Sequence, residues 1–573
     1  MGGVDTDTGT SNGPAAAAAR AAAVGALARA LRSADAGAPC PFTVDARRVR
    51  LSALPPQGDG EAAGADVGLY ARAPIDEGDV LVQVPFRRTL GERALAGRAC
   101  GAAIAELRSA AAVAAAESAW VFVQPGEVAT AAAIALVEAL PEETDYDEWR
   151  PYVQALPPPA ARVAMPLLWD DGAPELGVAG AADGTQVGAA IRRLRREGDA
   201  AAALAAPVLL ECAPRAFGGN GDSGACSDGG AGSESGNDRG SEGSGGGGTG
   251  EGGRGGNAAA AALRAARRAF LGALSMVQSR SFGLDEEELE ECDEAERAQV
   301  SAGSNMVPYI DMCNGALDGD SNVECIVAPI APPPGVRTPP TMCMVLRAER
   351  GIEAGEELLL SYGETSTAEF VAKYGCPPAA RGAGEPHALD CAVLWPPSDA
   401  LPPAESDASA GADTFAQAAL RAALREAVGA SCEQLMRPLA AVHGAADAAD
   451  AMLVSPFTLT CDDLNCALAA AEAADDEGGI AGDAAVEEVP ALGMLRCVAG
   501  VLAEHPLGGC GSGGRSGGAT AREVMLAFVD DALTRCVPPP PVGDGTPSAG
   551  EAGARYARAA ERALLERWRD ALA

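Results

Sequence analysis

The stretch MVPYIDMCNG, from Met306 to Gly315, is the densest polar cluster of the chain outside its tails. Asp311 and Asn314 close the apolar run within it. A polar group in such a place must find a partner or a ligand, because burying it unpaired costs free energy. This stretch is therefore the first candidate for a functional site.

A second polar stretch, LLLSYGETSTAEFVAKYG, runs from Leu358 to Gly375. Tyr362 ends a predicted strand there, directly before Gly363. Ser366 and Glu369 have the spacing of a helix-capping box. The short helix that they begin carries Tyr374, so we expect two tyrosines to lie near one another where the strand gives way to the helix.

Each of these residues taken alone has an ordinary structural explanation. Asn314 can cap a turn, and Asp311 can accept hydrogen bonds from backbone donors. Tyr362 and Tyr374 can be half-buried aromatic residues. Only the combination of these residues, in this order, points to chemistry.

Two copies of one local pattern, I-x-x-G-[DE]-x-L, lie at residues 75–81 and 352–358, the second directly before the Leu358–Gly375 stretch. In each copy Gly supplies a turn and the β-rich run after it supplies a strand. Short strands joined by turns are therefore expected to bracket the first two-thirds of the chain.

Helical periodicity fills the region between the two copies. One apolar face, stopped by three prolines, consists of Trp149, Tyr152, Val153 and Leu156. Residues 258–282 form another expected helix. Residues 213–257 are rich in Gly, Ser and acids and cannot bury a core, so they are expected to be a disordered surface insertion.

From about residue 385 onward the signals are those of amphipathic helices separated by Pro- and Gly-rich linkers. The apolar stripe of the last of these helices consists of Tyr556, Ala560, Leu564, Leu565, Trp568 and Leu572. Thr520 and Glu523 can form a capping box for an earlier one. These residues are expected to form a separate helical lobe.

Charge limits the kinds of partner. Forty-three Lys and Arg against 80 Asp and Glu give the 573-residue chain a formal net charge of −37. Phosphate contacts need clustered basic side chains, so this balance argues against nucleic-acid binding. It favours basic protein partners, although solubility and compositional bias explain most of it.

Residue types limit the chemistry. Lys373 is the only lysine, which excludes a Walker-type phosphate loop. The 16 cysteines form no CxxC pair, as is typical of thiols in a reducing compartment. The three histidines have no metal-ligating or triad spacing, so no metal is expected. No apolar run is long enough to predict a membrane span.

Four ordered blocks together resemble the SET-domain protein methyltransferases, in the branch of the Rubisco large-subunit lysine methyltransferase and the actin-histidine methyltransferase. The blocks are VGLYARAPIDEGDVLVQVP, EWRPYVQALP with Trp169 beyond it, SMVQSRSF, and PYIDMCNG followed by SYGETSTAEFVAKYG. They cover about residues 50–376. Four blocks in order are more specific than one short motif.

The resemblance implies an α+β class: a β-rich SET fold of small sheets with a threaded pseudoknot at the Asn-bearing motif, a helical insertion and an all-helical C-terminal lobe. The corresponding domains are a low-complexity tail at 1–45, a SET domain at 46–376 with the insertion at about 91–272, and a substrate-binding lobe at 385–573.

The resemblance also implies S-adenosyl-L-methionine as cofactor and assigns residues to the site by position. Tyr362 matches the catalytic tyrosine, while Phe282 and Leu360 would line the target channel. The residues assigned to the cofactor side are Val67 and Gly68 as a loop whose backbone meets it, Ser279 and Arg280 near its carboxylate, Asn314 as its holder with Asp311 as support, Gly315, and Tyr374 as second tyrosine.

Two positions depart from the family pattern. The chain has Asn314-Gly315 where the family usually has Asn-His, and Ala65 where it has an acidic residue. A backbone contact to adenine can survive with Gly at some loss of rigidity. Weaker cofactor binding, or a SET fold that only binds proteins and no longer catalyses, is the alternative that these two residues raise.

The implied activity is methyl transfer to a lysine of a non-histone protein. Histidine is the alternative target, because DMCN (311–314) and AEFV (368–371) are closer to the histidine-modifying relatives, whereas SRSF (279–282) is closer to the lysine-modifying ones. We expect a protein substrate bound partly by the C-terminal lobe, no nucleic acid, no membrane and a monomer. A cytoplasmic location is expected; an Ala- and Arg-bearing segment at 15–31 keeps a plastid address as the alternative, and no secretory signal is present.

Overall fold

The computed structural model describes just over half of the chain. It describes residues 22–23, 26–31, 42–53, 67–91, 94, 98, 100–140, 147–180, 185–217, 253–284, 292–300, 303–316, 320–332, 335, 337–363, 365–378, 390–394, 457–460, 526, 529–530, 532–534, 536–537 and 547–572. Ala65, all three histidines and the Thr520–Glu523 pair lie outside these residues, as does most of the expected tail at 1–45.

The largest sheet has six strands in the order β1-β4-β9-β8-β10-β7. Its members are β1 (Thr43–Val44), β4 (Val80–Pro85), β7 (Asn314–Ala316), β8 (Val323–Ile330), β9 (Thr341–Ala348) and β10 (Leu359–Ser361). The β4, β8 and β9 pairings are antiparallel, whereas β10 pairs in parallel with both β7 and β8. The parallel pairs join segments 37 to 45 residues apart, which no hairpin could do.

Three small antiparallel pairs complete the strands of the described residues. They are β2 (Val49–Ala53) with β3 (Val67–Ala71), β5 (Ser281–Leu284) with β6 (Gly303–Met306), and β11 (Cys391–Leu394) with β12 (Phe457–Thr460). Small sheets together with many helices confirm the predicted α+β class.

Both copies of the repeated pattern form the predicted turn, and they also pair with each other. Gly78 and Gly355 have φ values of 81° and 93°, which favour glycine. Ile75 and Ile352 form an antiparallel bridge with two backbone hydrogen bonds of 3.0 Å. The pairing therefore brings together two segments that lie nearly 280 residues apart.

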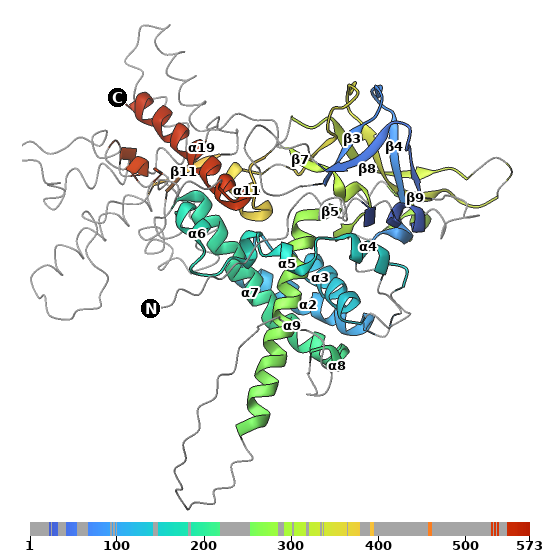
Figure 1. Ribbon diagram of the computed structural model, residues 1–573, viewed down its shortest axis with the longest axis horizontal. Coiled ribbons are helices and arrows are strands. Elements are labelled where there is room, and N and C mark those ends of the chain that lie inside the picture. The colour runs from blue at the N-terminus through green and yellow to red at the C-terminus, as the bar shows by residue number, and fades with distance from the viewer. Residues whose placement is uncertain are drawn as a thin grey trace, which may run out of the picture.

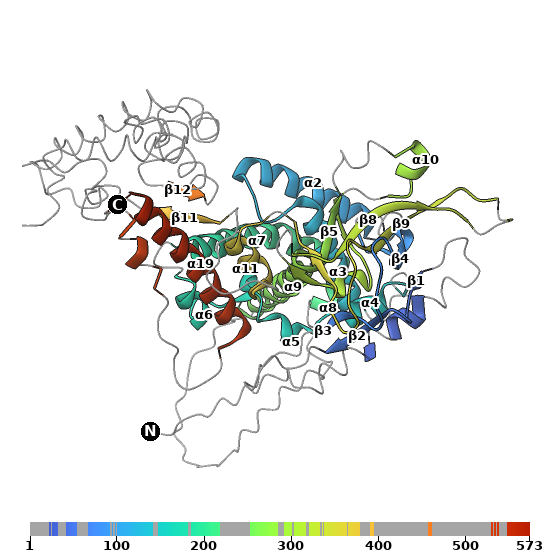
Figure 2. The ribbon, with the colours of Figure 1, turned by 90° about the horizontal axis from the view of Figure 1, so that it is seen from above.

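Helices occupy most of the region between β4 and β5. The helices there are α2 (Gly101–Ser118), α3 (Pro125–Ala139), α4 (Arg150–Ala155), α5 (Pro159–Arg162), α6 (Pro174–Val178), α7 (Gln186–Cys212), α8 (Pro214–Phe217) and α9 (Gly253–Arg280), with the short 3-10 turns η1 (Phe86–Arg88) and η4 (Pro166–Leu168). Beyond β5 lie the 3-10 turn η5 (Ile310–Met312) and the helices α10 (Glu294–Arg297), α11 (Thr367–Tyr374) and α19 (Ala549–Leu572). The β-rich part lies at one end, α19 lies toward the other, and α11 lies between them (Figure 1). The view from above shows the same order (Figure 2).

Two of the apolar cores in the described part of the chain join the sheet and the helices. The larger contains residues of the main sheet together with α2, α3, α7 and α9. The smaller joins α6, α7, α11 and α19 through Trp169, Ile191, Val371, Ala372, Ala554, Ala557 and their neighbours. Tyr152 and Val153 of α4 are buried as the periodicity predicted.

Four expectations about the elements need correction. Val67 and Gly68 lie in strand β3 and not in a loop, because their backbone pairs with β2. The 258–282 helix begins earlier, at Gly253, and ends at Arg280, where Ser281–Leu284 pairs as β5. Helices also occupy the two ends of the 213–257 tract; residues 218–252 lie outside the described part.

The fourth correction concerns the expected all-helical lobe. The short β-favouring runs CAVL and FTLT pair as β11 and β12 across more than 60 residues, since neither run has the length of a helix. In addition, α19 packs onto α11, because Ala554 and Ala557 of α19 are buried in the smaller core together with residues of α11. The boundaries of the lobe stay a prediction, as residues 395–456 and 461–525 lie outside the described part.

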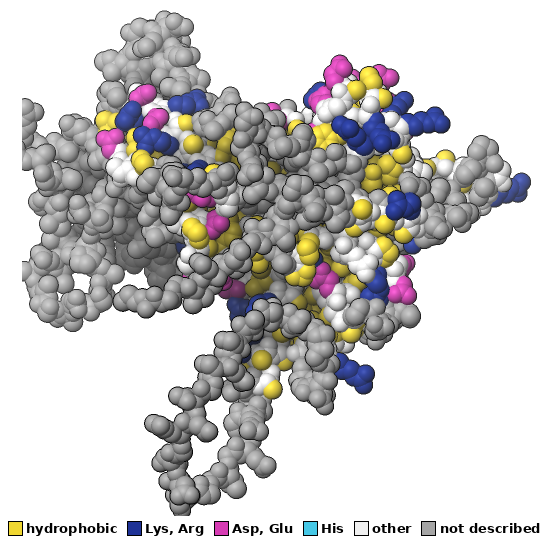
Figure 3. Space-filling view, viewed as in Figure 1, with side chains coloured by type: hydrophobic (Ala, Val, Ile, Leu, Met, Phe, Trp, Pro, Cys, Tyr) yellow, Lys and Arg dark blue, Asp and Glu magenta, His cyan; other side chains and the backbone are white. Residues whose placement is uncertain are grey.

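The surface of the β-rich end carries both signs of charge. Figure 3 shows Lys or Arg side chains next to acidic ones there. Arg47, Arg50 and Arg72 are exposed, and so are Asp76 and Glu77. The acidic excess of the chain therefore does not form a surface of one sign at this end.

Among the described helices, none combines the length and the apolar character that crossing a bilayer requires.

Candidate active site

The parallel pairing of β7 with β10 brings the two polar stretches of the sequence together. Leu359 lies opposite Asn314, and Leu360 lies opposite Gly315. Tyr362 follows β10 directly, and its backbone N donates to the carbonyl of Ala316 at 3.4 Å. The order of the strands therefore places Tyr362 beside the Asn-bearing motif.

The Tyr362 ring occupies the space above Gly315. A Cβ on residue 315 would lie 2.3 to 2.8 Å from three ring carbons of Tyr362, closer than real Cβ contacts. The Tyr362 hydroxyl donates to the carbonyl oxygen of Cys313 at 2.8 Å. The glycine that departs from the family pattern is thus the residue that admits this tyrosine.

Tyr374 lies against Tyr362, as the sequence predicted. Their ring centroids are 4.6 Å apart, and Phe370 lies 4.6 Å from Tyr374 and 6.0 Å from Tyr362. The predicted capping box of Ser366 and Glu369 begins α11 and is confirmed. We call these three rings, Tyr362, Phe370 and Tyr374, the aromatic cluster.

Further contacts hold α11 in place. The buried Asp390 carboxylate accepts from the backbone N and the hydroxyl of Thr367, at 2.6 and 2.8 Å. Lys373, the only lysine of the chain, lies 3.8 Å from Glu127 of α3. Burial raises the pKa of Glu127, and the Lys373 ammonium opposes that rise.

Asn314 is held by a carboxylate that the sequence did not single out. Its side-chain amide donates to Glu357 at 2.6 Å. Gly68 lies against both, since a Cβ there would come within 2.6 Å of Glu357 Oε1 and 3.0 Å of Asn314 Nδ2. Strand β3, strand β7 and the segment before β10 therefore meet at one point, and a side chain at residue 68 would have to displace the Glu357 carboxylate.

Asp311 and Arg280 form a second polar centre. The Arg280 guanidinium donates to the Asp311 carbonyl at 2.7 Å and lies 3.8 Å from its carboxylate, which is fully buried. The Tyr152 hydroxyl donates to the same carboxylate at 2.8 Å. The Nε of Arg280 is buried and has no hydrogen-bond partner in the structure. A buried donor of this kind is costly unless a ligand uses it.

Backbone strain lies next to this centre. Tyr309, which precedes η5, has a φ of 78°, a value that residues with a side chain rarely adopt. Its ring is buried and packs edge-on against Phe42 at 6.3 Å. Such strain costs free energy and is concentrated at functional sites, so its position here favours a functional role for the turn.

The remaining predicted residues lie around these two centres. The Ser279 hydroxyl donates to the Ser275 carbonyl of its own helix at 2.9 Å. Phe282 is half-buried in β5, where it pairs with Asn305, and Leu360 is buried in β10. Their roles at the cofactor and in the target channel stay predictions.

A pocket of about 730 Å³ lies where α2, α3, β5 and β6 meet. Its lining includes Arg108, Gln124, Gly283 and Ser304 and contains none of the predicted site residues. It borders β5 directly after Phe282. Phe282 and Leu360, the predicted channel residues, do not line this pocket.

Sequence reasoning missed three partners of the site: Tyr152, Glu357 and the Glu127–Lys373 pair. Tyr152 was identified only as a residue of an apolar helix face, and nothing in its spacing shows that its hydroxyl meets Asp311. Glu357 belongs to the repeated turn pattern, where acidic residues are usually exposed. Only the packing of distant segments reveals these contacts.

The donor set of the site favours an organic ligand and not a metal ion. In the described part of the chain, no three His, Cys, Asp or Glu side chains gather as a metal site would require. The site instead presents the unpartnered Arg280 donor and, at Gly68, a strand backbone that no side chain of its own covers. These features fit a ligand with an anionic group and close backbone contacts.

The three tyrosines near the site are expected to stay protonated in the folded protein. Burial raises the pKa of Tyr152, Tyr362 and Tyr374 above the ordinary value of about 10. The folded state therefore holds more protons than the unfolded state above about pH 10, so stability is intact below that pH and falls as pH rises further.

An alkaline titration followed by tyrosinate absorbance and circular dichroism checks this prediction. We expect the three tyrosines to ionise only together with loss of the native dichroism. Ionisation of all seven tyrosines near pH 10 in a protein that keeps its native dichroism would contradict it.

Comparison with known proteins gives no family at the level of sequence. No protein-family model and no curated protein matches the chain. Among solved structures, the SET domain of LSMT bound to lysine and AdoHcy is similar with a TM-score of 0.47 at 14% identity, covering 96% of this chain and 91% of that one. Rubisco LSMT bound to AdoMet gives a TM-score of 0.45 with the same identity and coverage. Both scores lie below 0.5, so nothing about this site is inferred from them.

Proposed function

We propose that this chain is an S-adenosylmethionine-dependent protein methyltransferase of the SET class that modifies a lysine side chain of a non-histone protein. The observation that carries the proposal is the β7–β10 pairing, which places Tyr362 against the Asn314-Gly315 motif. The four ordered sequence blocks support it independently.

The residues present fit the cofactor. Gly68 would let the β3 backbone approach it closely, and the Asn314 amide lies at the same point. The buried Arg280 Nε would donate to its carboxylate, which would satisfy a donor that otherwise has no partner. When bound, the cofactor supplies a methyl group already activated by its sulfonium, so no metal is required.

The protein then has to hold a neutral nitrogen in line with that methyl group. Correct positioning of two reactants can contribute roughly 7 to 11 kcal/mol to lowering a barrier. A free lysine has a pKa of about 10.4, and apolar surroundings such as the aromatic cluster disfavour its ammonium form. The ring faces also attract positive charge.

Tyr362 orients the amine in this proposal and is not the base. Burial raises the pKa of its hydroxyl, so the phenol keeps its proton at neutral pH. That proton is donated to the Cys313 carbonyl, which leaves the oxygen lone pairs to accept a hydrogen bond from the target amine. The proton that the lysine loses goes to water before transfer.

Transfer of labelled methyl from S-adenosylmethionine to a protein fraction tests the activity. We expect Tyr362→Phe to reduce transfer about tenfold, equivalent to ~1.4 kcal/mol, because one hydrogen bond that fixes the ring is lost. Tyr556→Phe in α19 is the matched control and should transfer like the wild type. Equal transfer by Tyr362→Phe and wild type would contradict the role of the hydroxyl.

Calorimetry with the cofactor separates this function from a SET-like module that only binds proteins. Gly315 is one reason for considering that alternative. In the structure, however, the missing side chain of Gly315 leaves the space that the Tyr362 ring occupies. Micromolar binding is expected for the wild type, and absence of binding would overturn the proposal in favour of the non-catalytic module.

Histidine is the second candidate target, favoured by the DMCN and AEFV strings. Mass spectrometry of the modified residue decides between the two. The acidic chain, with a net charge of −37, suits a basic substrate segment. The C-terminal part is proposed to help bind that substrate.

A further inference from the structure

The C-terminal helix α19 is packed against the helix that carries Tyr374. Ala554 and Ala557 of α19 lie in one buried cluster with Val371 and Ala372 of α11. Figures 1 and 2 both show the two helices next to each other. More than 170 residues of sequence separate them, so this contact is purely tertiary.

Gly553 is the point of closest approach. A Cβ on this residue would lie 3.0, 3.1 and 3.3 Å from the backbone C, Cα and N of Cys376. All three neighbours are main-chain atoms, which cannot move aside as the end of a flexible side chain can. A methyl group here would therefore press on the backbone directly after Tyr374.

That backbone has little room to yield. Gly375 ends α11 with a φ of 70°, and its N donates to Val371 at 2.9 Å. On its other side, a Cβ at Gly375 would lie 2.8 Å from Pro166 and 3.2 Å from the Ala164 carbonyl. The turn at residues 375–376 is thus enclosed between α19 and the segment leading into η4.

Buried polar contacts fix α19 independently of α11. The Arg558 guanidinium donates to the carbonyls of Val178 and Val537, each at 2.8 Å. The Glu561 carboxylate accepts from the backbone N of Gln186, at 3.0 and 3.2 Å. Arg558 and Glu561 are 1% and 2% exposed, so α19 cannot slide along α11 without leaving buried charges unpaired.

We propose that α19 positions Tyr374 within the aromatic cluster, with Gly553 as the positioning residue whose missing side chain sets how closely the two helices approach. The expected effect on the turnover rate rests on the proposed methyl transfer. The expected effect of Gly553 on the position of α11 and Tyr374 does not depend on that activity. Helix α19 would thereby help to shape the active site, although it lies in the C-terminal segment that follows the site residues in sequence.

Gly553→Ala in the full chain tests the proposal, with Gly177→Ala as the matched control. Gly177 lies in α6, a helix that also contacts α19, and a Cβ there would meet no atom within 4 Å. Both variants add one methyl group to a helix. Amide hydrogen exchange of residues 371–376, the rate of methyl transfer and the affinity for the cofactor are measured in each.

For Gly553→Ala we expect exchange in residues 371–376 to be about tenfold faster and the turnover rate to fall about tenfold. Cofactor affinity should fall by less than the turnover rate, because Tyr374 is displaced while Asn314 and Arg280 lie on other elements. Gly177→Ala should match the wild type in all three. Unchanged exchange in Gly553→Ala would overturn the proposal, and so would faster exchange with an unchanged turnover rate.

Global destabilisation gives a different result. It would accelerate exchange in β8 and β9 as much as in α11, and that outcome would also overturn the proposal. If the wild type transferred no methyl group, the proposed function would fail, while the exchange measurement would still decide whether Gly553 sets the position of α11.

Discussion

Gly315→Ala is expected to reduce methyl transfer by at least about a hundredfold. The added Cβ would lie 2.3 Å from the Tyr362 ring, so the ring has to leave its place above residue 315. The hydroxyl then loses the Cys313 carbonyl, and the ring contact with Tyr374 is broken. A displacement of about 1 Å at a reacting centre can cost a hundredfold in rate.

The matched control for this variant is Gly283→Ala. Gly283 is also a strand glycine, in β5, but a Cβ there would meet no atom within 4 Å. Its transfer rate and stability should stay close to those of the wild type. A Gly315→Ala protein as active as Gly283→Ala would contradict the assigned position of Tyr362.

A double-mutant cycle keeps this prediction testable even where activity is lost. The three closest contacts of the added Cβ are all with the Tyr362 ring, so Gly315→Ala should destabilise the wild type more than it destabilises a Tyr362→Ala background. Urea unfolding of the four proteins measures the coupling. Additive free energies would show that the two residues do not touch.

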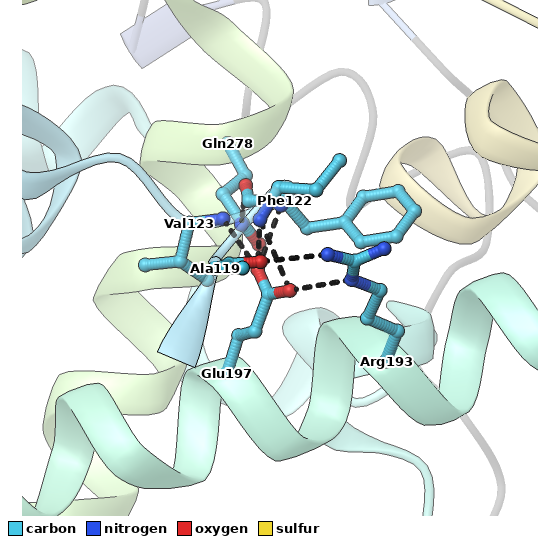
Figure 4. Close-up of polar contacts among 7 residues, drawn as sticks. Ala119, Phe122, Val123, Arg193, Glu197 and Gln278 are labelled. Carbon is cyan, nitrogen blue, oxygen red and sulfur yellow. Dashed lines mark hydrogen bonds and ion pairs between the residues drawn. The ribbon is translucent and has the colours of Figure 1, made fainter. Parts of the chain in front are cut away.

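Glu197→Ala is expected to lower the free energy of unfolding by about 3 kcal/mol or more. The carboxylate, with 7% of the side chain exposed, accepts the backbone amides of Val121, Phe122 and Val123 at 2.7 to 3.1 Å. Arg193 donates to it at 2.9 Å and also donates to the Ala119 carbonyl at 2.7 Å (Figure 4). Removing it deprives three backbone donors of their acceptor, of which the Val123 amide is buried and the other two are partly buried. An unsatisfied buried donor costs about 1 to 3 kcal/mol, and a partly buried one costs less.

This cluster matters because of the loop that it holds. Ala119 ends α2 with a φ of 48°, a conformation that a non-glycine residue adopts only when its surroundings impose it. Gln278 lies in α9, two residues before Arg280. Its side chain donates to the Phe122 carbonyl at 2.9 Å (Figure 4). Loss of Glu197 should therefore loosen the contact between this loop and the helix that carries Arg280.

Asp199→Ala provides the control for Glu197→Ala. Asp199 lies on the same helix and pairs with Arg267 at 2.6 Å, but the two side chains are 57% and 43% exposed. Exposed ion pairs contribute about 0 to 1 kcal/mol. Equal effects of the two substitutions on urea unfolding would contradict the importance of the buried carboxylate.

The local predictions from sequence succeeded where the cause was local. The turns at Gly78 and Gly355, the capping box of Ser366 and the buried face of Tyr152 and Val153 follow from patterns a few residues long. The proximity of Tyr362 and Tyr374 also follows, because a short strand-to-helix junction joins them. The α+β class, which the resemblance implied, is also what the structure shows.

Predictions failed where a distant segment decided the outcome. Val67 and Gly68 form a strand because β2 is there to pair with them, and the supposedly all-helical region contains β11 and β12 because two short runs meet. The contact of the last helix with α11 was also not predicted, because Ala554 and Ala557, which make it, lie outside the apolar stripe that the sequence shows.

From the amino-acid order alone, the chain determines its turns, its caps, its amphipathic faces and the residue types of the candidate site. Tertiary structure alone decides that Tyr362 lies on Gly315, that Tyr152 and Glu357 hold Asp311 and Asn314, and that Gly553 lies against Cys376. The physical reason is range: backbone torsions and capping bonds act over a few residues, whereas close packing and buried hydrogen bonds depend on which remote segments occupy the same space.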